Sequence, residues 1–524
     1  MLYSYGFMLC SSKNSNCNLF WTNTHVGAHV LRSMKSWQRI NHFPRSYLIT
    51  KKDTLYESID RASVQYGDLF DFIPDPFIVK PAGSSRGIGI RFINSEQQVD
   101  ELNNNEKLLI SRYIDRPFLV KSLKWDLRVY VLVTSFYPLI IYIYSDGLAR
   151  FAVHEYEENR GNYADVNTHL TNYSLNKSSK KFVKNVGIDS ENVGHKWTLG
   201  ALLREMEKQG VDTPLLMVRI EDIVIKTLLS IQGSVAASCR KLNLHPKCCF
   251  ELFGFDILVD ENLKPWLLEV NLSPSLACDA PIDSILKTNL LADTLNIAEI
   301  PLVRQKNILN SDPAAVLSEA PGVAKTDEQA LRRKRMSNRV SKVRRAQLNH
   351  KPSFSAENIN AQYLARAKCH FDKLQSEIEK KGHFIRVFPR KSTWSMYSSI
   401  LEDVGQEKWD EDLYFRMTEG VERPNITVRD IKLAHQQLLN TTKFPSRKEL
   451  SSVVREVLLQ DALTEANRYK MKMYSADLKP YPAALPRVRS PARRRTKSQL
   501  FAEELRKLNL AAQKLVYSPK TQIC

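Results

Sequence analysis

The sequence predicts a mixed α/β (α+β) fold, and three features of the chain lead to that prediction. Residues 250–275 alternate apolar and polar positions as two strands do, and the short turn Asp260–Glu261–Asn262 separates them. Residues 77–93 have the pattern of a strand, a Gly/Ser-rich loop and a second strand. Later stretches have helical patterns at residues 327–349, 356–381 and 426–475.

Length and charge narrow the class of protein. A chain of 524 residues is too long for one hydrophobic core, so roughly two to four domains are expected. Its 76 Lys and Arg residues against 57 Asp and Glu residues give a net charge of +19, which indicates nucleic acid, anionic lipid or an acidic protein surface as a partner. The eight cysteines lack metal-ligand spacing and indicate thiols in a reducing compartment. No apolar stretch approaches the roughly 20 residues of a membrane span, and residues 1–9 lack a signal-peptide pattern.

Shifts in composition divide the chain into segments. The expected boundaries are 1–16, an unassigned N-terminal tail; 17–76, a small N-terminal domain; 77–297, the main folded lobes; 298–326, a linker; 327–400, a basic helix and the region after it; 401–478, a helical extension; and 479–524, a basic and largely disordered tail.

Asp256, Glu269 and Asn271 are the residues most informative about chemistry. Asp256 lies among the apolar positions of the first strand of the predicted hairpin, and Glu269 lies on the return strand. Two bare carboxylates among apolar neighbours repel each other and lose hydration, so each needs a cation. Oxygen ligands from Asp, Glu and Asn suit a hard ion such as Mg²⁺, which keeps other positions for phosphate oxygens. The alternative is a hairpin whose acidic residues face water.

The Gly/Ser-rich loop after Lys80 has the composition of a phosphate-binding loop. Gly83, Gly87 and Gly89 permit close approach of the backbone to a ligand, and Arg86 suits phosphate oxygens. Lys80, at the strand end, would place a point charge on a phosphate. The residue order excludes a Walker loop, and the strand after the glycines disfavours a Rossmann turn. An ordinary hairpin turn is the alternative.

Polar and charged residues also mark the ends of two apolar strands. Residues 108–114 read as a strand whose end either presents backbone groups to an adenine edge or belongs to the core. Lys124, Asp126 and Arg128 share one face at the mouth of a buried strand. Charge at that position is costly unless it is paired or binds a ligand, so either a ligand site or a structural Asp126–Arg128 pair is expected.

Arg150 and the polar run His169–Ser174 complete an ordered set: a Lys and Gly loop, an adenine-edge strand, a charged strand mouth, a polar run and an Asp…Glu-x-Asn trio. In this order the chain resembles the tubulin-tyrosine-ligase-like enzymes, which have an ATP-grasp fold, and among them the long polyglutamylases. The resemblance covers Asn18 to about Ile297. The segments that carry it are Asn41–Ser46, Ile78–Pro81, Lys124–Arg128, His169–Ser174 and Trp266–Leu276, and Lys381–Pro389 is similar to a segment after the core in a polyglutamylase subgroup.

The resemblance implies an ATP-grasp-type ligase core, with its central and C-terminal lobes at 77–297, followed by a mostly helical basic C-terminal extension. It implies that ATP is held by Lys80, Arg86, Gly87, Ser111, Arg112, Tyr113, Ile114, Lys124, Trp125, Asp126, Thr171 and Asn172. It assigns free glutamate to Arg150, Tyr173, Ser174 and Lys196, and Mg²⁺ to Asp256, Glu269 and Asn271. Arg128 and Glu269 are the catalytic candidates. Arg128 is expected to stabilise the phosphate that is transferred from ATP, and Lys52 is expected near that phosphate.

The activity that the resemblance implies is ATP-dependent addition of glutamate to glutamate side chains of tubulin tails, through an acyl phosphate. ATP and Mg²⁺ are then the cofactors, and free L-glutamate and acidic tubulin tails are the partners. Neither a membrane nor a nucleic acid is expected as a partner, and a monomer is expected. The implied location is the cytoplasm, on the cytoskeleton, at a cilium or basal body.

A basic helix after the linker suits the acidic surface of a microtubule. Its positive residues, with no acid between them, are Arg332, Arg333, Lys334, Arg335, Arg339, Lys342, Arg344 and Arg345. A solvated basic helix or a nuclear-import run is the alternative.

One region departs from the family pattern, because only residues 51–76 stand between the Asn41–Ser46 motif and the strand that carries Lys80. An omitted exon in the gene model would explain the shortening. A real deletion favours the alternative of a catalytically impaired microtubule-binding homologue. A donor other than glutamate, namely glycine or tyrosine, is a third reading within the same enzyme class.

Overall fold

The computed structural model describes residues 2–10, 17–73, 78–81, 91–92, 108–111, 113–156, 166–185, 191–301, 372–403, 414, 432, 435–436 and 439–440. At 78–81, 91–92 and 108–111 it describes the backbone alone. The chain divides into two units, Met1–Ile300 with Glu379–Cys524 and Pro301–Ile378, and every element named below belongs to the first.

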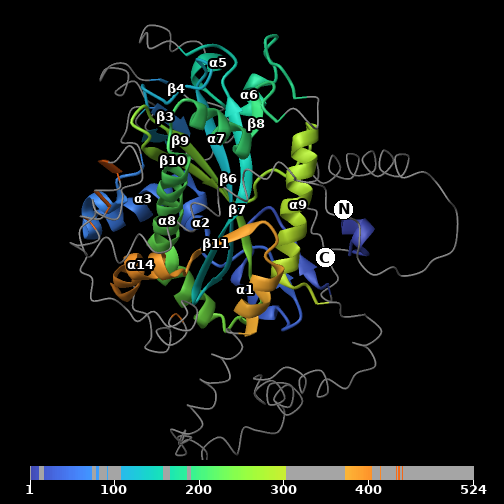
Figure 1. The fold of residues 1–524 in the computed structure, drawn as a ribbon. Helices are drawn as coiled ribbons and strands as arrows, with labels where there is room; N and C mark the ends of the chain where they lie inside the picture. The colour runs from blue at the N-terminus through green and yellow to red at the C-terminus, as the bar shows by residue number, and fades with distance from the viewer. Residues whose placement is uncertain are drawn as a thin grey trace, which may run out of the picture. The chain divides into compact units, whose positions relative to one another are not determined.

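An antiparallel sheet of six strands lies at the centre of the described part of the first unit (Figure 1). Its strand order is β10 (Pro265–Asn271), β9 (Glu251–Val259), β6 (Trp125–Phe136), β7 (Leu139–Phe151) and β11 (Phe384–Phe388), and β8 (Lys196–Thr198) also pairs with β7. Strands β6, β7 and β9 are long apolar runs, and nearly all of their residues are buried. The sheet confirms the mixed α+β class, and the hairpin predicted within 250–275 is β9 and β10.

Two smaller sheets accompany the central one. Strands β3 (Ile78–Pro81), β4 (Arg91–Phe92) and β5 (Leu108–Ser111) form an antiparallel sheet in the order β4-β3-β5. It contains the strands predicted on both sides of the Gly/Ser-rich loop and the predicted adenine-edge strand. Strands β1 (Leu19–Phe20) and β2 (Arg39–Ile40) pair in parallel in the N-terminal segment.

The helices that the structure describes are η1 (Leu2–Tyr5), α1 (Ala28–Ser33), α2 (Tyr47–Thr50), α3 (Lys52–Tyr66), η2 (Gly67–Phe70), α5 (Val166–His169), α6 (Tyr173–Asn176), α7 (Leu199–Lys208), α8 (Thr213–Lys241), α9 (Pro281–Ala298) and α14 (Lys391–Asp403). Helices α2, α3, α7, α8, α9 and α14 contact strands of the central sheet. Helices α8 and α9 both contact β6 and β7, and Figure 1 shows them on either side of these strands. Asp212 caps α8 by accepting a hydrogen bond from the Leu215 backbone N–H at 3.0 Å.

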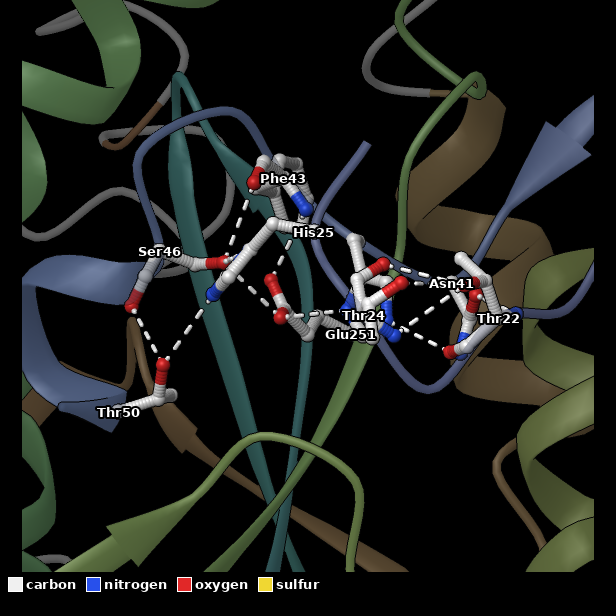
Figure 2. A network of polar contacts seen from close by, with 9 residues as sticks. Thr22, Thr24, His25, Asn41, Phe43, Ser46, Thr50 and Glu251 are labelled. Carbon is white, nitrogen blue, oxygen red and sulfur yellow. Dashed lines mark hydrogen bonds and ion pairs between the residues drawn. The ribbon is translucent and has the colours of Figure 1, made fainter. Parts of the chain in front are cut away.

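A buried carboxylate at the start of β9, Glu251, joins the N-terminal segment to the central sheet, as Figure 2 shows. Its Oε1 accepts hydrogen bonds from His42 Nδ1 at 2.8 Å and Ser46 Oγ at 2.9 Å, and its Oε2 accepts one from the Phe43 backbone N–H at 2.9 Å. The Nε2 atom of His42 lies 2.7 Å from the Thr22 carbonyl oxygen. Each ring nitrogen of His42 therefore lies within hydrogen-bond distance of an oxygen atom, and the contact with Glu251 is a buried ion pair when both nitrogens carry a proton.

The segment after the predicted linker completes one edge of the central sheet. Strand β11 pairs antiparallel with residues 141–144 of β7. Just before it, Gly382 has a φ of +54°, and a Cβ atom there would lie 2.1 Å from the Asp293 carboxylate, so only glycine fits. The side chains of Trp394 and Tyr397 in α14 are buried, which confirms the compact piece predicted after Gly382.

Several predicted segments lie outside the described residues. They include the basic helix at 327–349 with all eight of its positive residues, most of the helical stretch at 426–475, and the tail at 479–524. Among the residues that the structure does describe, the cysteines are free thiols, and no helix is both long and apolar enough to cross a bilayer.

Candidate active site

The register of the central sheet brings two arginines and two aspartates together on one face. Arg150 of β7 lies directly opposite Asp126 of β6, and Arg128, two residues further along β6, lies opposite Asp256 of β9. Residues paired in this way project to the same side of a sheet, as do residues two apart on one strand. Gly254 makes room for them, because a Cβ atom at that position would lie 2.9 Å from the Arg128 side chain.

These four side chains form a connected chain of buried ion pairs, from Asp126 through Arg150 and Asp256 to Arg128. Arg150 contacts both carboxylates, with Nε 2.8 Å from Asp126 Oδ1 and Nη2 2.9 Å from Asp256 Oδ2. Arg128 binds both oxygens of Asp256, with Nη2 at 2.9 Å from Oδ2. Burial opposes ionisation of Asp256, but the two guanidinium groups outweigh it and hold the pKa of Asp256 well below its ordinary value. The direct Asp126–Arg128 pair considered from sequence is wrong, because each residue bonds instead to a residue on a neighbouring strand.

A β-bulge places Glu269 in this site. The register of β10 on β9 shifts between Leu267, which pairs with Ile257, and Glu269, which pairs with Asp256. Leu268 is the extra residue. If Leu268 instead paired with Asp256 in an unshifted register, Glu269 would fall opposite Phe255 and project to the other face of the sheet, since a slip of one residue reverses every side chain.

The two hairpin carboxylates and Asn271 converge as the sequence predicted. The Asn271 side-chain nitrogen lies 3.3 Å from Asp256 Oδ2 and 3.3 Å from Glu269 Oε1. Lys52, at the start of α3, lies 3.7 Å from Glu269 Oε2. Burial and the nearby Asp256 charge raise the pKa of Glu269. Two carboxylates that resist joint ionisation and a neighbouring amide form a donor set that suits a divalent cation. Within the described residues no cluster of three His, Cys, Asp or Glu side chains is arranged so that it could hold a metal ion.

A second charged cluster begins where β8 extends the same face of the sheet. Lys196 lies directly opposite Arg150 and is buried. Its Nζ forms an ion pair with Asp283 of α9 at 2.8 Å and lies 3.9 Å from the centre of the Tyr173 ring. Lys287, one turn further along α9, lies 2.9 Å from the other oxygen of Asp283. Burial, with the charges of nearby acidic residues, raises the pKa of Tyr173 to about 12, so its hydroxyl remains protonated and can donate a hydrogen bond.

Lys124 directly precedes β6 and packs beneath aromatic rings. Its Nζ lies 4.0 Å from the centre of the Tyr113 ring and 5.7 Å from that of Tyr156. The Tyr113 hydroxyl lies 2.7 Å from His169 Nδ1, which joins the segment after β5 to the predicted polar run. Trp125 is buried, but neighbouring residues in a strand project to opposite faces, so its ring faces away from the side occupied by Asp126. Any contact of Trp125 with a nucleotide would come from its backbone.

The remaining predicted positions are only partly described. Thr171 is buried, and Asn172 precedes α6, which carries Tyr173 and Ser174. Lys80 and Ser111 are backbone positions on β3 and β5, and Ile114 is half-buried beyond β5. Arg86, Gly87 and Arg112 lie outside the described residues.

Sequence reasoning missed the contribution of α9. Asp283 and Lys287 lie on that helix, and Tyr130 approaches the same cluster from β6, four residues after Asp126. The local signal was present: Pro281 and Asp283 are typical of a helix start, and Lys287 follows Asp283 by one turn. Nothing in the local sequence indicates that this turn of helix meets Lys196.

Comparison with known proteins decides the family. A model of the tubulin-tyrosine ligase family matches residues 74–308. The tubulin polyglutamylase ttll-5 of Caenorhabditis elegans is 41% identical over 581 aligned positions, which cover 98% of this chain and 78% of that protein. The chain belongs to the tubulin-tyrosine ligase family. Membership confirms the resemblance that the ordered motifs indicated.

Other members of the tubulin-tyrosine ligase family match over a large part of the chain. The mouse tubulin polyglutamylase TTLL5 is 37% identical over 77% of this chain, and the human tubulin monoglutamylase TTLL4 is 32% identical over 76% of it. The chain spans about a third of the length of these two relatives, with coverage of 32% and 35%. The alignment with the nematode protein is longer than this chain of 524 residues, so that relative has residues which this chain lacks within the matched region.

Proposed function

We propose that the chain is an ATP-dependent ligase that adds glutamate to glutamate side chains of tubulin tails, with an ATP-grasp-type core. One observation carries the proposal: a continuous row of charged side chains on one face of the central sheet. The row begins with the Asp256 and Glu269 carboxylates, continues through Arg128 and Arg150, and ends at Lys196. The carboxylate end would bind a cation and the other end an anion. A ligase needs both when it uses ATP with a metal ion and an acidic amino acid as donor.

The nucleotide would lie between the small sheet and the cation-binding end of this row. Its proposed contacts are the predicted positions on or next to β3, β5 and β6, including Lys80, Ser111, Tyr113 and Lys124, together with Thr171 and Asn172. Lys124 is buried and already close to two aromatic rings, so a nucleoside beside it would remain shielded from water. Family membership supports ATP as the nucleotide.

Asp256, Glu269 and Asn271 would hold Mg²⁺. When bound, the ion would offset negative charge on the terminal phosphates of ATP. The raised pKa of Glu269 and the contacts of Asn271 with both carboxylates support this site, because a cation removes the repulsion that burial strengthens. Arg128 would stabilise the transferred phosphate, and its contact with Asp256 and that of Lys52 with Glu269 keep both positive groups beside the proposed metal site.

The donor amino acid would lie at the other end of the row. Arg150, Tyr173, Ser174 and Lys196 are the predicted contacts, and we add Lys287 because it shares the Asp283 carboxylate with Lys196. Two lysines and an arginine favour glutamate over glycine or tyrosine, because glutamate alone among these donors has a second carboxylate.

The reaction would proceed in two balanced steps. An acceptor carboxylate oxygen attacks the γ-phosphorus of ATP, the bond to the β,γ-bridging oxygen breaks, and an acyl phosphate and ADP result. The amine of free glutamate then attacks the acyl carbon, loses a proton, and expels phosphate to leave an isopeptide bond. The protein supplies position and fixed charge, and Arg128 and Arg150 remain charged throughout.

An acidic acceptor tail suits the surface next to the donor end. The lysines at 177, 180, 181 and 184 are exposed in a segment that begins at α6. Phe182 holds this segment in place, stacked on His195 with ring centroids 5.3 Å apart and edge-on to Tyr173 at 5.6 Å. The names of the relatives support tubulin as the acceptor, and a tubulin modifier acts on the cytoskeleton. Placement at a cilium or basal body, and action as a monomer, remain part of the proposal.

The activity is tested by incorporation of labelled glutamate into purified tubulin with ATP and Mg²⁺. We expect incorporation that requires both, that labelled glycine and tyrosine do not replace, and that Glu269→Gln abolishes. Glu261→Gln is the matched control, because Glu261 lies in the exposed turn of the same hairpin. Absence of ATP-dependent incorporation by the wild-type chain would contradict the proposal.

Microtubule binding by the basic stretch is tested separately. Changing Arg332, Arg333, Lys334 and Arg335 to glutamate should reduce co-sedimentation with microtubules, and binding of the unchanged chain should weaken steeply with salt. Unchanged binding of the variant would show that this stretch is not the microtubule contact.

A further inference from the structure

Asp283 holds two lysines with one fully buried carboxylate. Its Oδ2 accepts a hydrogen bond from Lys196 Nζ at 2.8 Å, and its Oδ1 forms an ion pair with Lys287 Nζ at 2.9 Å. It also accepts a hydrogen bond from the Ala280 backbone N–H at 3.1 Å, in the capping box of α9. Asp283 therefore fixes the position of one lysine on β8 and one on α9 relative to the start of that helix.

The charge of this cluster is not balanced. Along the rest of the row, Arg128 and Arg150 compensate Asp126 and Asp256. Among the residues that the structure describes, the lysine cluster instead has two ammonium groups and one buried carboxylate, which leaves one positive charge in a buried place. The charge of Asp279 also acts on Lys196 and Tyr173, but Asp279 is exposed, so water screens its charge.

Tyrosine hydroxyl groups do not supply the missing negative charge. Tyr130 faces Lys287 from β6, but burial raises the pKa of Tyr130, so its hydroxyl is neutral at physiological pH. Tyr173 faces Lys196 from α6 and is neutral for the same reason. A ligand with exactly one further carboxylate would balance the cluster.

We propose that Asp283 is a positioning residue that sets donor specificity, by holding Lys196 and Lys287 so that they present one uncompensated positive charge to the side-chain carboxylate of the donor. The inference rests on the proposed ligase function and deepens it. Asp283 itself need not touch the donor. Without its carboxylate the two ammonium groups repel each other, and at least one of them moves or loses its proton.

The test compares steady-state kinetics of Asp283→Asn with those of the wild-type chain, varying glutamate and ATP in turn. Asparagine keeps an oxygen for the Ala280 cap, but its amide nitrogen must face one of the lysines. We expect the KM for glutamate to rise at least about tenfold, with the KM for ATP unchanged. Asp212→Asn, at the cap of α8, is the control and should change neither KM. Asp283→Glu retains the charge and should restore part of the loss.

The outcomes separate this inference from the proposed function. If the wild-type chain incorporates no glutamate, the proposed function fails. If the wild-type chain is active and Asp283→Asn has a glutamate KM within twofold of it, or if both KM values rise together, the positioning role is wrong. If the asparagine variant does not fold, Asp283→Glu decides: its displaced carboxylate should raise the KM for glutamate alone, and wild-type kinetics in that variant would overturn the inference.

Discussion

Replacement of Glu251 by glutamine tests the buried ion pair between the N-terminal segment and β9. Glutamine has nearly the same shape but no charge, and its amide nitrogen must take the place of one carboxylate oxygen. At Oε2 that nitrogen would face the Phe43 backbone N–H, and at Oε1 it would face the Ser46 hydroxyl and His42 Nδ1. In the first orientation two donors oppose each other, and in both orientations the negative charge beside His42 is lost.

The expected loss is large because both partners are fully buried. Removal of one member of a buried ion pair costs about 3 to 5 kcal/mol in the free energy of unfolding. Ser46→Ala removes one of the hydrogen bonds to the same carboxylate and should cost only about 2 kcal/mol. Glu57→Gln, an exposed position on α3, is the surface control and should change stability by less than about 0.5 kcal/mol.

Urea unfolding of the three variants and the wild-type chain, followed by tryptophan fluorescence and circular dichroism, measures these differences. The order of stability should be Glu57→Gln, then Ser46→Ala, then Glu251→Gln. A Glu251→Gln variant within about 1 kcal/mol of the wild-type chain would show that the pair is not a buried ion pair of this strength.

Three further changes test other features in the same unfolding assay. Burial, with the positive charges of neighbouring groups, lowers the pKa of His25 from 6.5 to about 4, so its contribution to stability is complete above pH 6.5 and is lost as the pH falls toward 4. The His25→Asn variant should therefore lose less stability over that range than the wild-type chain. Parallel curves of unfolding free energy against pH for the two proteins would contradict the reasoning. Burial raises the pKa of Asp146 from 3.8 to about 6, so its contribution to stability is present at low pH and is lost as the pH rises through 6. At pH 7 the Asp146→Asn variant should be more stable than the wild-type chain by about 1 to 3 kcal/mol, and a less stable variant would refute this. Gly382→Ala should lower the free energy of unfolding by more than about 2 kcal/mol, because it adds a clash with Asp293 to the cost of a positive φ. Gly210→Ala, at φ +85° with open space around it, should lower it by only about 1 kcal/mol. Equal losses in the two variants would exclude the clash.

The meeting of Asp256 and Glu269 could be predicted because local sequence contains most of the information. Alternation on both sides of a short turn predicts a hairpin, and a hairpin brings its own two strands together. Local sequence did not show the bulge at Leu268, although the face of Glu269 depends on it. The carboxylate pair was therefore predicted correctly from residue types, while the register that produces it came only from the structure.

Contacts between distant segments were beyond local patterns. Arg128 and Asp256 are 128 residues apart, and their pairing requires β6 to lie beside β9. The contact between Lys196 and Asp283 requires α9 to return to the end of β8. The ordered motifs indicated which residues belong to the site, since they identify the family, but they did not indicate which charge neutralises which.

Strand β11 has a practical consequence for any minimal enzyme. A fragment that stopped after α9 would leave residues 141–144 of β7 with unsatisfied backbone donors and acceptors, and such an edge recruits strands from other molecules. Active preparations should therefore retain residues 382–403. Conversely, a protease cut between residues 302 and 371 should yield two polypeptides that stay associated through this strand, so that nicking visible on a denaturing gel need not abolish turnover.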